Sequence, residues 1–276
     1  MIDFKYIKKL KDILYQNQYK KKKYLGQHFL FDKNILKKIV EKADLTKDDV
    51  VLEIGPGIGT LTLAISQAAG SVIALERDRD LYEFLKKYID EHGIENIDLR
   101  YIDALKFNIE NLPEKYKIVA NIPFKITSPL LWKYLLSSRS PESMTLMVQK
   151  EVAERIVAGS GEMSLLAVLC QYRSDVKLEF YVKRGSFSPP PRVDSAVVKF
   201  LVKDKCADVD ERIFFDFVKK CFTQKRKLLV STISRITGHK KEDIKNIFNL
   251  LNIPENSRPQ DLDVDDWIKL YKKGII

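Results

Sequence analysis

The tetrapeptide Asn121-Ile122-Pro123-Phe124 holds the side chains with the clearest potential for chemistry. It directly follows the apolar run 118–120, which predicts a buried strand. A strand with this ending presents a short amide, a rigid proline turn and a flat ring at one tip. The amide carbonyl can accept a hydrogen bond from an exocyclic amine, and the ring can stack on a flat base. The alternative interpretation is an ordinary strand-to-helix turn whose phenylalanine lies in the core.

A second group of chemically useful residues surrounds a glycine-rich turn. The apolar run 50–54 predicts a strand, and Gly55, Gly57 and Gly59 follow it before a helical pattern begins. Glycines at such a turn permit a tight backbone path and let the backbone approach a ligand closely. Glu76 ends the next predicted strand, 21 residues after Gly55. A carboxylate at that place can accept both hydroxyl groups of a ribose.

The spacing of these glycines distinguishes two classes of nucleotide-binding enzyme. Nicotinamide-dependent dehydrogenases carry GxGxxG, whereas this chain has GxGxG, with the third glycine one residue early. Asp103, after the third predicted strand, adds a carboxylate that can accept from the amino group of an adenine. This order of acids, followed by the Asn-Ile-Pro-Phe turn, is typical of methyltransferases that use S-adenosylmethionine to methylate an amine. The alternative is that Glu76 and Asp103 merely cap helices.

Alternating strands and helices predict the framework that positions these side chains. Buried strands are expected at residues 50–54, 71–75, 97–101, 116–120 and 144–148, with helices at 61–69 and 81–89 between the first three. Strands separated by helices favour right-handed crossovers and a mostly parallel sheet, whose carboxyl edge binds ligands. Residues 176–182 and 196–202 have no helix between them and predict an antiparallel pair at the sheet edge. We therefore expect an α/β, Rossmann-like class I methyltransferase fold.

The rest of the chain is predicted to be helical. Residues 203–210 are polar and indicate a linker. Helices are then expected at 213–222, 228–236 and 244–251, and around Trp267. We expect a basic N-terminal extension over residues 1–24, a methyltransferase domain over 25–203 and a small all-α domain over 204–276.

The charge distribution favours a nucleic-acid partner. The chain of 276 residues carries a net charge of +10, which is typical of proteins that bind polyanions. Residues 1–24 contain eight lysines and two aspartates, and residues 212–245 contain ten basic and three acidic residues. Two basic clusters on either side of one candidate site favour RNA or DNA over a membrane. The alternative is that both clusters are solvated surfaces without a ligand.

Other classes are disfavoured by the cysteine content and the hydropathy. The three cysteines lack CxxC spacing, so neither disulfides nor a zinc site is expected, and a reducing cytoplasm is the default compartment. No apolar run has transmembrane length. Apolar residues recur at helical spacing over residues 4–14, without the continuous apolar core of a secretory signal. We expect a cytoplasmic protein whose first helix leads into the lysine arm 20–23.

Taken together, these motifs resemble those of the small-subunit ribosomal RNA adenine-N6,N6-dimethyltransferases (the KsgA/RsmA family). The resemblance covers nearly all of residues 24–236. Its most specific part is the string FSPPPRVDSA at residues 187–196. Further matches are the entry motif LGQHFL at 25–30, the string MVQKEVAER at 147–155 and the basic segment QKRK at 224–227.

The resemblance implies a reaction and a set of partners. The reaction is the transfer of methyl groups from S-adenosylmethionine to the N6 amines of two adjacent adenosines near the 3′ end of small-subunit (16S) rRNA. The product is N6,N6-dimethyladenosine, made during ribosome biogenesis. The implied partners are the small ribosomal subunit and its rRNA, and the enzyme is expected to be a monomer that requires no metal and no membrane.

The expected site residues fall into three groups. Those expected to bind the cofactor are His28, Leu30, Gly55, Gly57, Glu76, Asp103 and Asn121. Those expected to act on the target base are Asn121, Pro123 and Phe124. Those expected to bind RNA phosphates are Lys21, Lys22, Lys23, Arg192, Lys225, Arg226 and Lys227.

One departure from the family pattern leaves the RNA target open. The family more often has Asn-Leu-Pro-Tyr where this chain has Asn-Ile-Pro-Phe, a form that also occurs in large-subunit rRNA methyltransferases of the macrolide-resistance type. Phe124 keeps the stacking surface and lacks the hydroxyl group. A 23S rRNA adenine-N6 methyltransferase and a non-catalytic ribosome assembly factor therefore remain alternatives, and a nicotinamide oxidoreductase is the least favoured.

Overall fold

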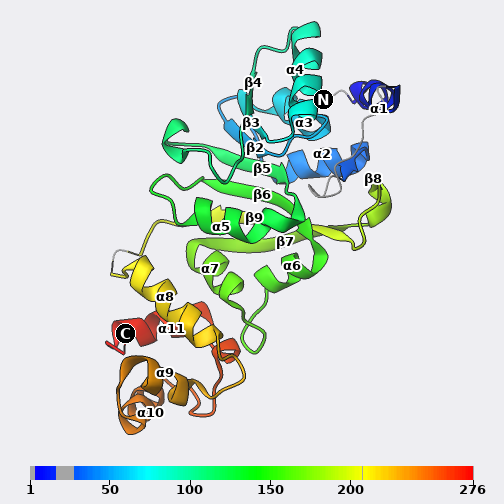
Figure 1. Cartoon of the computed structure of the whole chain (residues 1–276). Helices are drawn as coiled ribbons and strands as arrows, with labels where there is room; N and C mark the ends of the chain where they lie inside the picture. Colours follow the sequence, from blue (N-terminus) through cyan, green and yellow to red (C-terminus); the bar gives the residue numbers. More distant parts are fainter. Residues whose placement is uncertain (1–3, 17–27, 207, 276) are drawn as a thin grey trace. The chain divides into compact units, whose positions relative to one another are not determined.

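The computed structural model describes residues 4–16, 28–206 and 208–275. These residues form two compact units, and each is described here by itself (Figure 1). The first unit contains the described residues up to Ala153 together with Lys177–Val202. The second contains Glu154–Val176 and the described residues from Lys203 onward. In the part of the chain that the structure describes, no helix is long and apolar enough to cross a bilayer.

The first unit is built on a mixed sheet of seven strands among the described residues, of which the edge strand Ser174–Val182 begins with three residues of the second unit. In spatial order the strands are β4 (Ile97–Tyr101), β3 (Ser71–Glu76), β2 (Val50–Ile54), β5 (Lys117–Asn121), β6 (Ser143–Gln149), β9 (Ser195–Val202) and β7 (Ser174–Val182). The pairs from β4 through to β6 are parallel, and β9 runs antiparallel to β6. Within this sheet the chain begins at β2 and continues outward to β3 and then β4. It then returns to β5, which lies on the other side of β2. Ligands bind outside the carboxyl ends of the strands at such a reversal.

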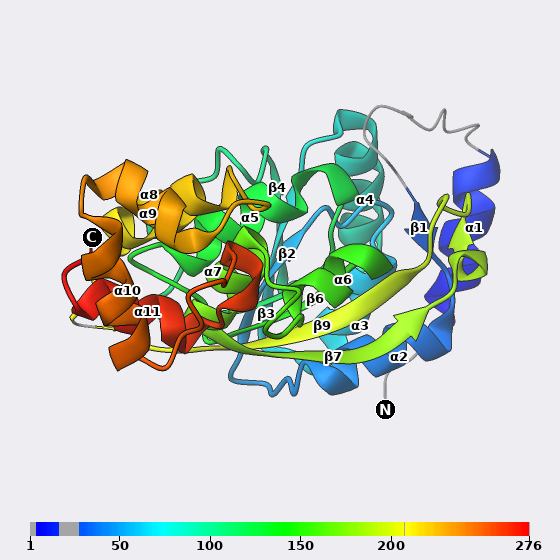
Figure 2. The same ribbon diagram turned by 90° about the horizontal axis from the view of Figure 1, so that it is seen from below.

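Apolar helices cover the sheet and hold its strands in place. The bounds are α1 (Tyr6–Gln16), α2 (Lys33–Lys42), α3 (Thr60–Ala68), α4 (Arg79–Glu91), α5 (Thr127–Leu135) and α6 (Lys150–Ile156). Buried side chains of α2, α3 and α4 join one hydrophobic cluster with one face of the sheet. The buried side chains of α5 do not belong to that cluster, and α3 and α5 lie on opposite sides of the sheet (Figure 2). The result is a three-layer α/β unit.

Polar side chains start several of these helices where the strands end. Asp32 accepts hydrogen bonds from the backbone of the first turn of α2, and Asp78 does the same for α4. The turn before α3 ends at Gly59, which has a φ of +87° and offers no side-chain cap. The first backbone amides of α3 therefore donate no hydrogen bond to an N-cap side chain.

A short two-stranded ribbon joins two distant motifs. β1 (Phe29–Leu30), from the entry motif, pairs antiparallel with β8 (Phe187–Ser188), which opens the proline-rich string. His28, just before β1, donates from Nδ1 to the Pro189 carbonyl at 2.9 Å. Short 3-10 turns complete the described elements: Ile109–Asn111, Phe124–Ile126, Arg184–Ser186 and Pro259–Asp261.

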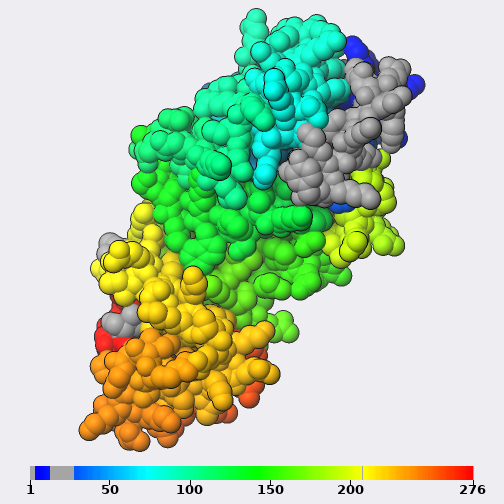
Figure 3. Space-filling view, viewed as in Figure 1, coloured from blue at the N-terminus to red at the C-terminus, as the bar shows by residue number. Residues whose placement is uncertain are grey.

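The second unit is helical, and aromatic side chains form its core. Its helices are α7 (Leu165–Arg173), α8 (Glu211–Phe222), α9 (Leu229–Thr237), α10 (Lys241–Leu250) and α11 (Val264–Lys272). Trp267, Phe214 and Phe248 are fully buried, and Trp267 packs edge-on against Phe217. In the space-filling view α8 to α10 form one continuous surface, coloured yellow to orange (Figure 3).

Residues 154–176 group with the helical unit, although they lie between segments of the first unit in the sequence. The reason is that α7 packs against α8: the ring of Tyr172 stacks on Phe214 at 5.1 Å, and the buried Arg173 lies 3.3 Å from Glu211.

The elements expected from the sequence are otherwise present. Each predicted strand of the parallel sheet lies within two residues of an observed one, and 176–182 and 196–202 are neighbours at the sheet edge, as β7 and β9. The helix expected near the N-terminus is α1. Residues 17–27, which contain the lysine arm, lie outside the described residues.

Candidate cofactor and acceptor site

A cavity opens at the carboxyl ends of β2 and β5, where the order of the strands reverses. Every residue expected to bind the cofactor or to act on the target base lines it: His28, Leu30, Gly55, Gly57, Glu76, Asp103, Asn121, Pro123 and Phe124. They come from the entry motif, three strand ends and the turn after β5. The structure thus brings together side chains that are spread over 97 positions of the chain.

The glycine turn brings the backbone close to both sides of this cavity. Gly55 and Gly57 have φ of +72° and +60°, which favours glycine over any residue with a side chain. A β-carbon at Gly57 would lie 3.2 Å from Phe29 Cε1, and one at Gly55 would lie 3.4 Å from Pro123 Cδ. A β-carbon on this turn would therefore contact the entry motif on one side and, on the other, the turn at Pro123, called the acceptor turn below.

Glu76 lies at the end of β3 beneath this turn. The side chain is 5% exposed, and its two oxygens accept from the Gly57 and Asp78 amides at 3.0 and 2.7 Å. Burial raises the pKa of Glu76, while these two amide hydrogen bonds oppose the shift. Each carboxylate oxygen has a second lone pair, so the group can accept from ribose hydroxyls while it stays bound to the backbone.

Asp103 follows β4, the strand that pairs with β3. Its Oδ1 accepts from the Leu105 amide at 2.9 Å, and its Oδ2 lies 3.4 Å from Nη1 of Arg77. Each acid accepts from backbone amides, but neither is the N-cap of a helix, because Asp78 caps α4 and Asn108 caps the 3-10 turn Ile109–Asn111. Both carboxylates also line the cavity.

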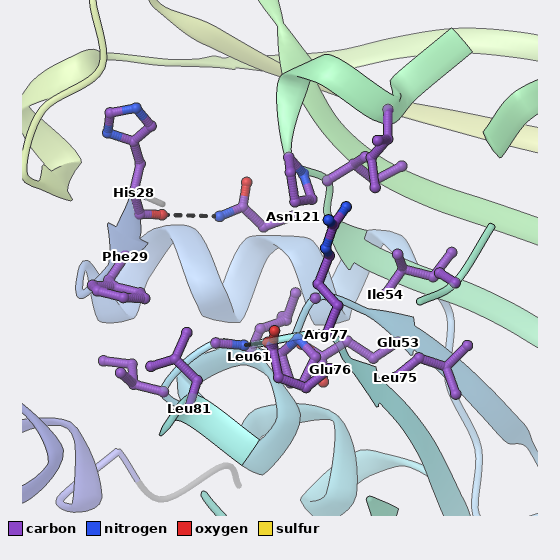
Figure 4. A pocket seen from close by; sticks show the side chains of 18 of the residues that line it. His28, Phe29, Glu53, Ile54, Leu61, Leu75, Glu76, Arg77, Leu81 and Asn121 are labelled. Carbon is purple, nitrogen blue, oxygen red and sulfur yellow. Dashed lines mark hydrogen bonds between the residues drawn. The ribbon is translucent and has the colours of Figure 1, made fainter. Parts of the chain in front are cut away.

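The Asn121 side chain is oriented so that its carbonyl oxygen is available. Its Nδ2 donates to the His28 carbonyl at 3.4 Å, as the dashed line in Figure 4 shows. Among the described residues, no group donates a hydrogen bond to the Asn121 Oδ1. The Ile122 carbonyl likewise accepts no hydrogen bond from another described residue. Two acceptors therefore remain unused at the tip of β5.

The Phe124 ring forms one wall of this acceptor region. It is half-buried and lies roughly parallel to the His28 ring, with centroids 6.2 Å apart and an interplanar angle of 26°. Pro123 fixes the turn, and its carbonyl accepts from the Ile126 amide at 3.0 Å. The three features expected from the tetrapeptide, an amide acceptor, a rigid turn and a flat ring, are therefore all present.

Phe187 and Glu53 are among the cavity residues that the sequence did not indicate as site residues. Phe187 lines the cavity from β8, and Glu53 lines it from β2 with an exposed fraction of 1%. Burial raises the pKa of Glu53 to about 8, and the negative charge of Glu76 adds to this shift. The Glu53 Oε2 atom has no hydrogen-bond partner among the described residues. A charged residue inside an apolar strand is the signal that could have identified Glu53.

The residues expected to bind RNA are only partly described. Lys21, Lys22 and Lys23 lie outside the described residues. Arg192, in the first unit, is exposed. Lys225, Arg226 and Lys227 are exposed in the turn between α8 and α9 of the second unit, and no ion pair to another described residue is recorded for them. Their charges are available to a ligand.

Comparison with known proteins identifies the family. The model of the family described as ribosomal RNA adenine dimethylase matches residues 18–274. The chain belongs to this family. The resemblance expected from the sequence is therefore confirmed, and α1 lies before the matched region.

Curated relatives and solved structures agree with this assignment. Proteins named ribosomal RNA small subunit methyltransferase A are similar over most of their length. The one from Mycoplasmopsis synoviae is 42% identical over 253 residues, covering 91% of this chain and 95% of the relative. The one from Dehalococcoides mccartyi (strain BAV1) is 39% identical over 258 residues, covering 91% and 87%.

Two solved structures share the fold over most of both chains. A dimethyladenosine transferase from Plasmodium falciparum has a TM-score of 0.77 at 29% identity, covering 90% of this chain and 98% of that one. The 23S rRNA methyltransferase ErmE has a TM-score of 0.73 at 25% identity, covering 89% and 98%. The predicted fold, a Rossmann-like methyltransferase with a helical C-terminal part, is confirmed.

Proposed function

We propose that this protein transfers methyl groups from S-adenosylmethionine to the N6 amines of two adjacent adenosines near the 3′ end of small-subunit rRNA, giving N6,N6-dimethyladenosine. The observation that carries the proposal is the close approach of the glycine turn at Gly55 to the acceptor turn at Pro123, both of which line one cavity. Family membership and the names of the curated relatives support the choice of adenine and of the small subunit.

The cavity residues fit S-adenosylmethionine. Glu76 offers acceptor positions to a ribose, and Asp103 offers one to the amino group of an adenine. Glu53 has a buried oxygen without a partner, which an N–H donor of the ligand would satisfy. His28, Leu30, Gly55 and Gly57 are proposed to complete the cofactor site. When bound, the cofactor supplies an electrophilic methyl group.

The residues at the tip of β5 can orient the target amine. We assign the Asn121 Oδ1 and the Ile122 carbonyl as acceptors for the two N6 hydrogens, because both atoms are unused. Holding both hydrogens directs the nitrogen lone pair, and the Phe124 ring fixes the plane of the base. The gain in rate comes mainly from orientation, with a smaller electrostatic contribution. The target base must leave any stacked helix to reach the cavity.

Basic residues on both units are proposed to bind RNA phosphates. These are Lys21, Lys22, Lys23, Arg192, Lys225, Arg226 and Lys227. Phosphate contacts position an RNA without reading its bases, so the choice of target depends on RNA shape and on the acceptor cavity. We further propose that the enzyme acts in the cytoplasm as a monomer on the small ribosomal subunit.

The test is methylation of defined ribosomal substrates. Small subunits that lack the modification are incubated with labelled S-adenosylmethionine, and nucleosides are analysed for dimethyladenosine. An Asn121→Ala variant should lose about 10²- to 10³-fold in kcat while it still binds RNA. Absence of dimethyladenosine with folded, cofactor-binding protein would refute the proposal. Small subunits matured normally by an inactive Asn121→Ala variant would instead favour an assembly role without catalysis.

Large-subunit RNA is the second candidate target. The Asn-Ile-Pro-Phe form of the acceptor turn and the structural likeness to ErmE favour it. Offering unmodified small and large subunits in parallel reactions separates the two targets. Methylation confined to the large subunit would replace the first proposal with the second.

A further inference from the structure

The Lys133 ammonium binds three backbone carbonyls of one loop. Lys133 lies on α5 and donates from Nζ to three backbone carbonyls, those of Ala104, Leu105 and Phe107, at 3.0, 2.8 and 2.5 Å. An ammonium group has three N–H donors, so these carbonyls use all of them. The three carbonyls belong to the loop that follows Asp103.

The same peptide groups that accept from Lys133 also hold Asp103. The Ala104 carbonyl and the Leu105 amide form one planar peptide unit, whose carbonyl accepts from Lys133 and whose N–H donates to Asp103 Oδ1 at 2.9 Å. The next unit repeats the pattern. Its Leu105 carbonyl accepts from Lys133, and its Lys106 amide donates to the Asp103 carbonyl at 2.8 Å. Two peptide units therefore connect the Lys133 ammonium with Asp103.

This arrangement fixes both the direction and the strength of the hydrogen bond to the Asp103 carboxylate. A planar peptide cannot turn its N–H without turning its carbonyl, and the ammonium holds the carbonyl. A cation at the carbonyl end also polarises the peptide and strengthens the bond at the N–H end. Burial lowers the pKa of Lys133, and the charge of Asp103 opposes this shift. Lys133 is therefore electrostatically linked to Asp103 although the two side chains do not touch.

Lys133 also joins this loop to the acceptor side of the site. α5 begins at Thr127, directly after the 3-10 turn Phe124–Ile126 that carries the stacking ring. The helix that starts at the acceptor turn thus holds the loop of the adenine-side carboxylate. The side chains of Ala104 and Phe107 are themselves buried in the core, so the loop is packed on the fold independently of the Lys133 ammonium. What the ammonium adds is the orientation of the peptide planes.

We propose that Lys133 is a positioning residue for recognition of the adenine ring of the cofactor, acting through the two peptide units that hold the Asp103 carboxylate. This inference rests on the proposed function, because it takes Asp103 as the acceptor for the adenine amino group. It predicts that loss of the ammonium weakens binding of an adenine ligand more than binding of a ligand whose ring lacks that amino group.

The experiment compares two ligands by calorimetry. S-adenosylhomocysteine carries the 6-amino group, and S-inosylhomocysteine carries an oxygen in its place. Lys133→Met keeps an unbranched apolar side chain and removes the ammonium. We expect it to bind S-adenosylhomocysteine about tenfold more weakly and to lose most of its preference over S-inosylhomocysteine. Lys106→Met is the matched control, since Lys106 lies exposed in the same loop, and it should leave both affinities unchanged.

A second variant tests whether the effect passes through Asp103. In an Asp103→Ala background the ligand preference is already lost, so adding Lys133→Met should change the preference little. Lys133→Arg keeps a positive charge near the three carbonyls and should therefore recover part of the preference for adenine. Recovery should be incomplete, because a planar guanidinium cannot bind all three carbonyls as the ammonium does. If Lys133→Met does not fold, as judged by circular dichroism, Lys133→Arg is the deciding variant. A reduced preference for adenine in Lys133→Arg would support the proposal, and an unchanged preference would refute it.

The outcomes separate this inference from the proposed function. If the unmodified protein does not bind S-adenosylhomocysteine, the proposed function is wrong. If it binds, but folded Lys133→Met keeps the full preference for adenine, the role of Lys133 is wrong and the proposed function stands. Equal weakening of both ligands would also refute the inference, because it would show a general support of the cavity rather than recognition of the amino group.

Discussion

Gly55, in the turn that is proposed to face the cofactor, lies beside Pro123, in the turn that is proposed to face the target base. A β-carbon at Gly55 would lie 3.4 Å from Pro123 Cδ, and the φ of Gly55 is +72°. The two turns follow neighbouring parallel strands, β2 and β5, on either side of the point where the strand order reverses. The order of the strands therefore determines how far apart the glycine turn and the acceptor turn lie.

Gly55→Ala is expected to strain the backbone and to place a methyl group against Pro123. A side chain at positive φ costs roughly 1–2 kcal/mol, and the added β-carbon would lie at van der Waals distance from Pro123 Cδ. We expect kcat to fall and the affinity for S-adenosylhomocysteine to weaken. Gly93→Ala is the control, because Gly93 has a φ of +57° with nothing within 4 Å of the added β-carbon. Similar losses of ligand affinity in both variants would contradict a specific role of the Gly55–Pro123 contact.

Phe124 is expected to act through its ring and not through a polar group. Stacking of a base on an aromatic ring is worth about 1–3 kcal/mol, so Phe124→Ala should lower kcat/KM by roughly ten- to a hundredfold. Phe124→Tyr keeps the ring and should retain most of the activity. Steady-state methylation of small subunits measures both variants. Full activity of Phe124→Ala would show that the base is held by other groups.

The fold could be predicted because short-range patterns determine most of it. Buried parallel strands such as β2 and β5 are continuous apolar runs, and each is followed by glycine or proline where the chain turns. Gly55, Glu76 and Asn121 could be expected at one edge of the sheet because parallel strands end there, and all three line the cavity. The order of the strands alone is enough to predict that these residues lie close together.

Contacts between distant segments could not be predicted in the same way. The pairing of Phe29–Leu30 with Phe187–Ser188 joins segments more than 150 positions apart by a ribbon of two residues per strand, too short for a periodic signal. The packing of α7 against α8 depends on the fit of Tyr172 against Phe214, which no local pattern encodes. Lys133 resembles any helix-surface lysine until the loop after β4 is placed beside it.

Glu53 should make the stability of the protein depend on pH. Burial raises its pKa from 4.5 to about 8, so between these values the folded protein holds a proton that the unfolded chain has released. A rise in pH across this window therefore favours the unfolded state, by at most about 1.4 kcal/mol for each pH unit. Glu53→Gln removes this loss and should stabilise the protein at pH 8 relative to the unmodified chain.

Urea unfolding of both proteins at pH 4.5 and pH 8 measures this effect. We expect the difference in the free energy of unfolding to be small at the lower pH and to reach a few kcal/mol at the higher one. Glu76 contributes with the same sign in both proteins, because burial also raises its pKa. An equal difference at both pH values would show that Glu53 does not titrate in this window.

The exposed cations between α8 and α9 should contribute to RNA affinity through salt-dependent contacts. Replacing Lys225, Arg226 and Lys227 by Gln is expected to weaken binding of small-subunit RNA and to reduce the slope of log K against log salt by about 2–3. Binding is measured by filter retention over a series of salt concentrations, with the free energy of unfolding as a check on the fold.

A matched control for this prediction removes three cations that are already paired with acids. Lys245 lies 3.0 Å from Glu255, Lys269 lies 3.4 Å from Asp266, and Lys272 lies 3.2 Å from Asp208. Their joint replacement by Gln changes the net charge by the same amount and should alter the slope less. Equal slopes for the two triple variants would mean that only the overall charge matters.

The helix α1 should be a stable part of the first unit although it precedes the region matched by the family. Leu10 is fully buried in the hydrophobic cluster shared by α2, α3 and the sheet, and the Tyr6 hydroxyl donates to the Thr60 carbonyl at 2.8 Å. Thr60 begins α3 and lines the cofactor cavity, so α1 contacts the helix on which the glycine turn ends.

Leu10→Ala tests whether α1 packs in this way in solution. Truncating a buried leucine removes apolar contacts and leaves a cavity, so we expect the free energy of unfolding to fall by about 2–4 kcal/mol. Lys8→Ala changes an exposed residue of the same helix and should stay within about 0.5 kcal/mol of the unmodified protein. Because α1 contacts α3 at Thr60, Leu10→Ala should also weaken S-adenosylhomocysteine binding, whereas Lys8→Ala should not. Unfolding curves for Leu10→Ala that coincide with those of Lys8→Ala would show that α1 does not pack on α3 in solution.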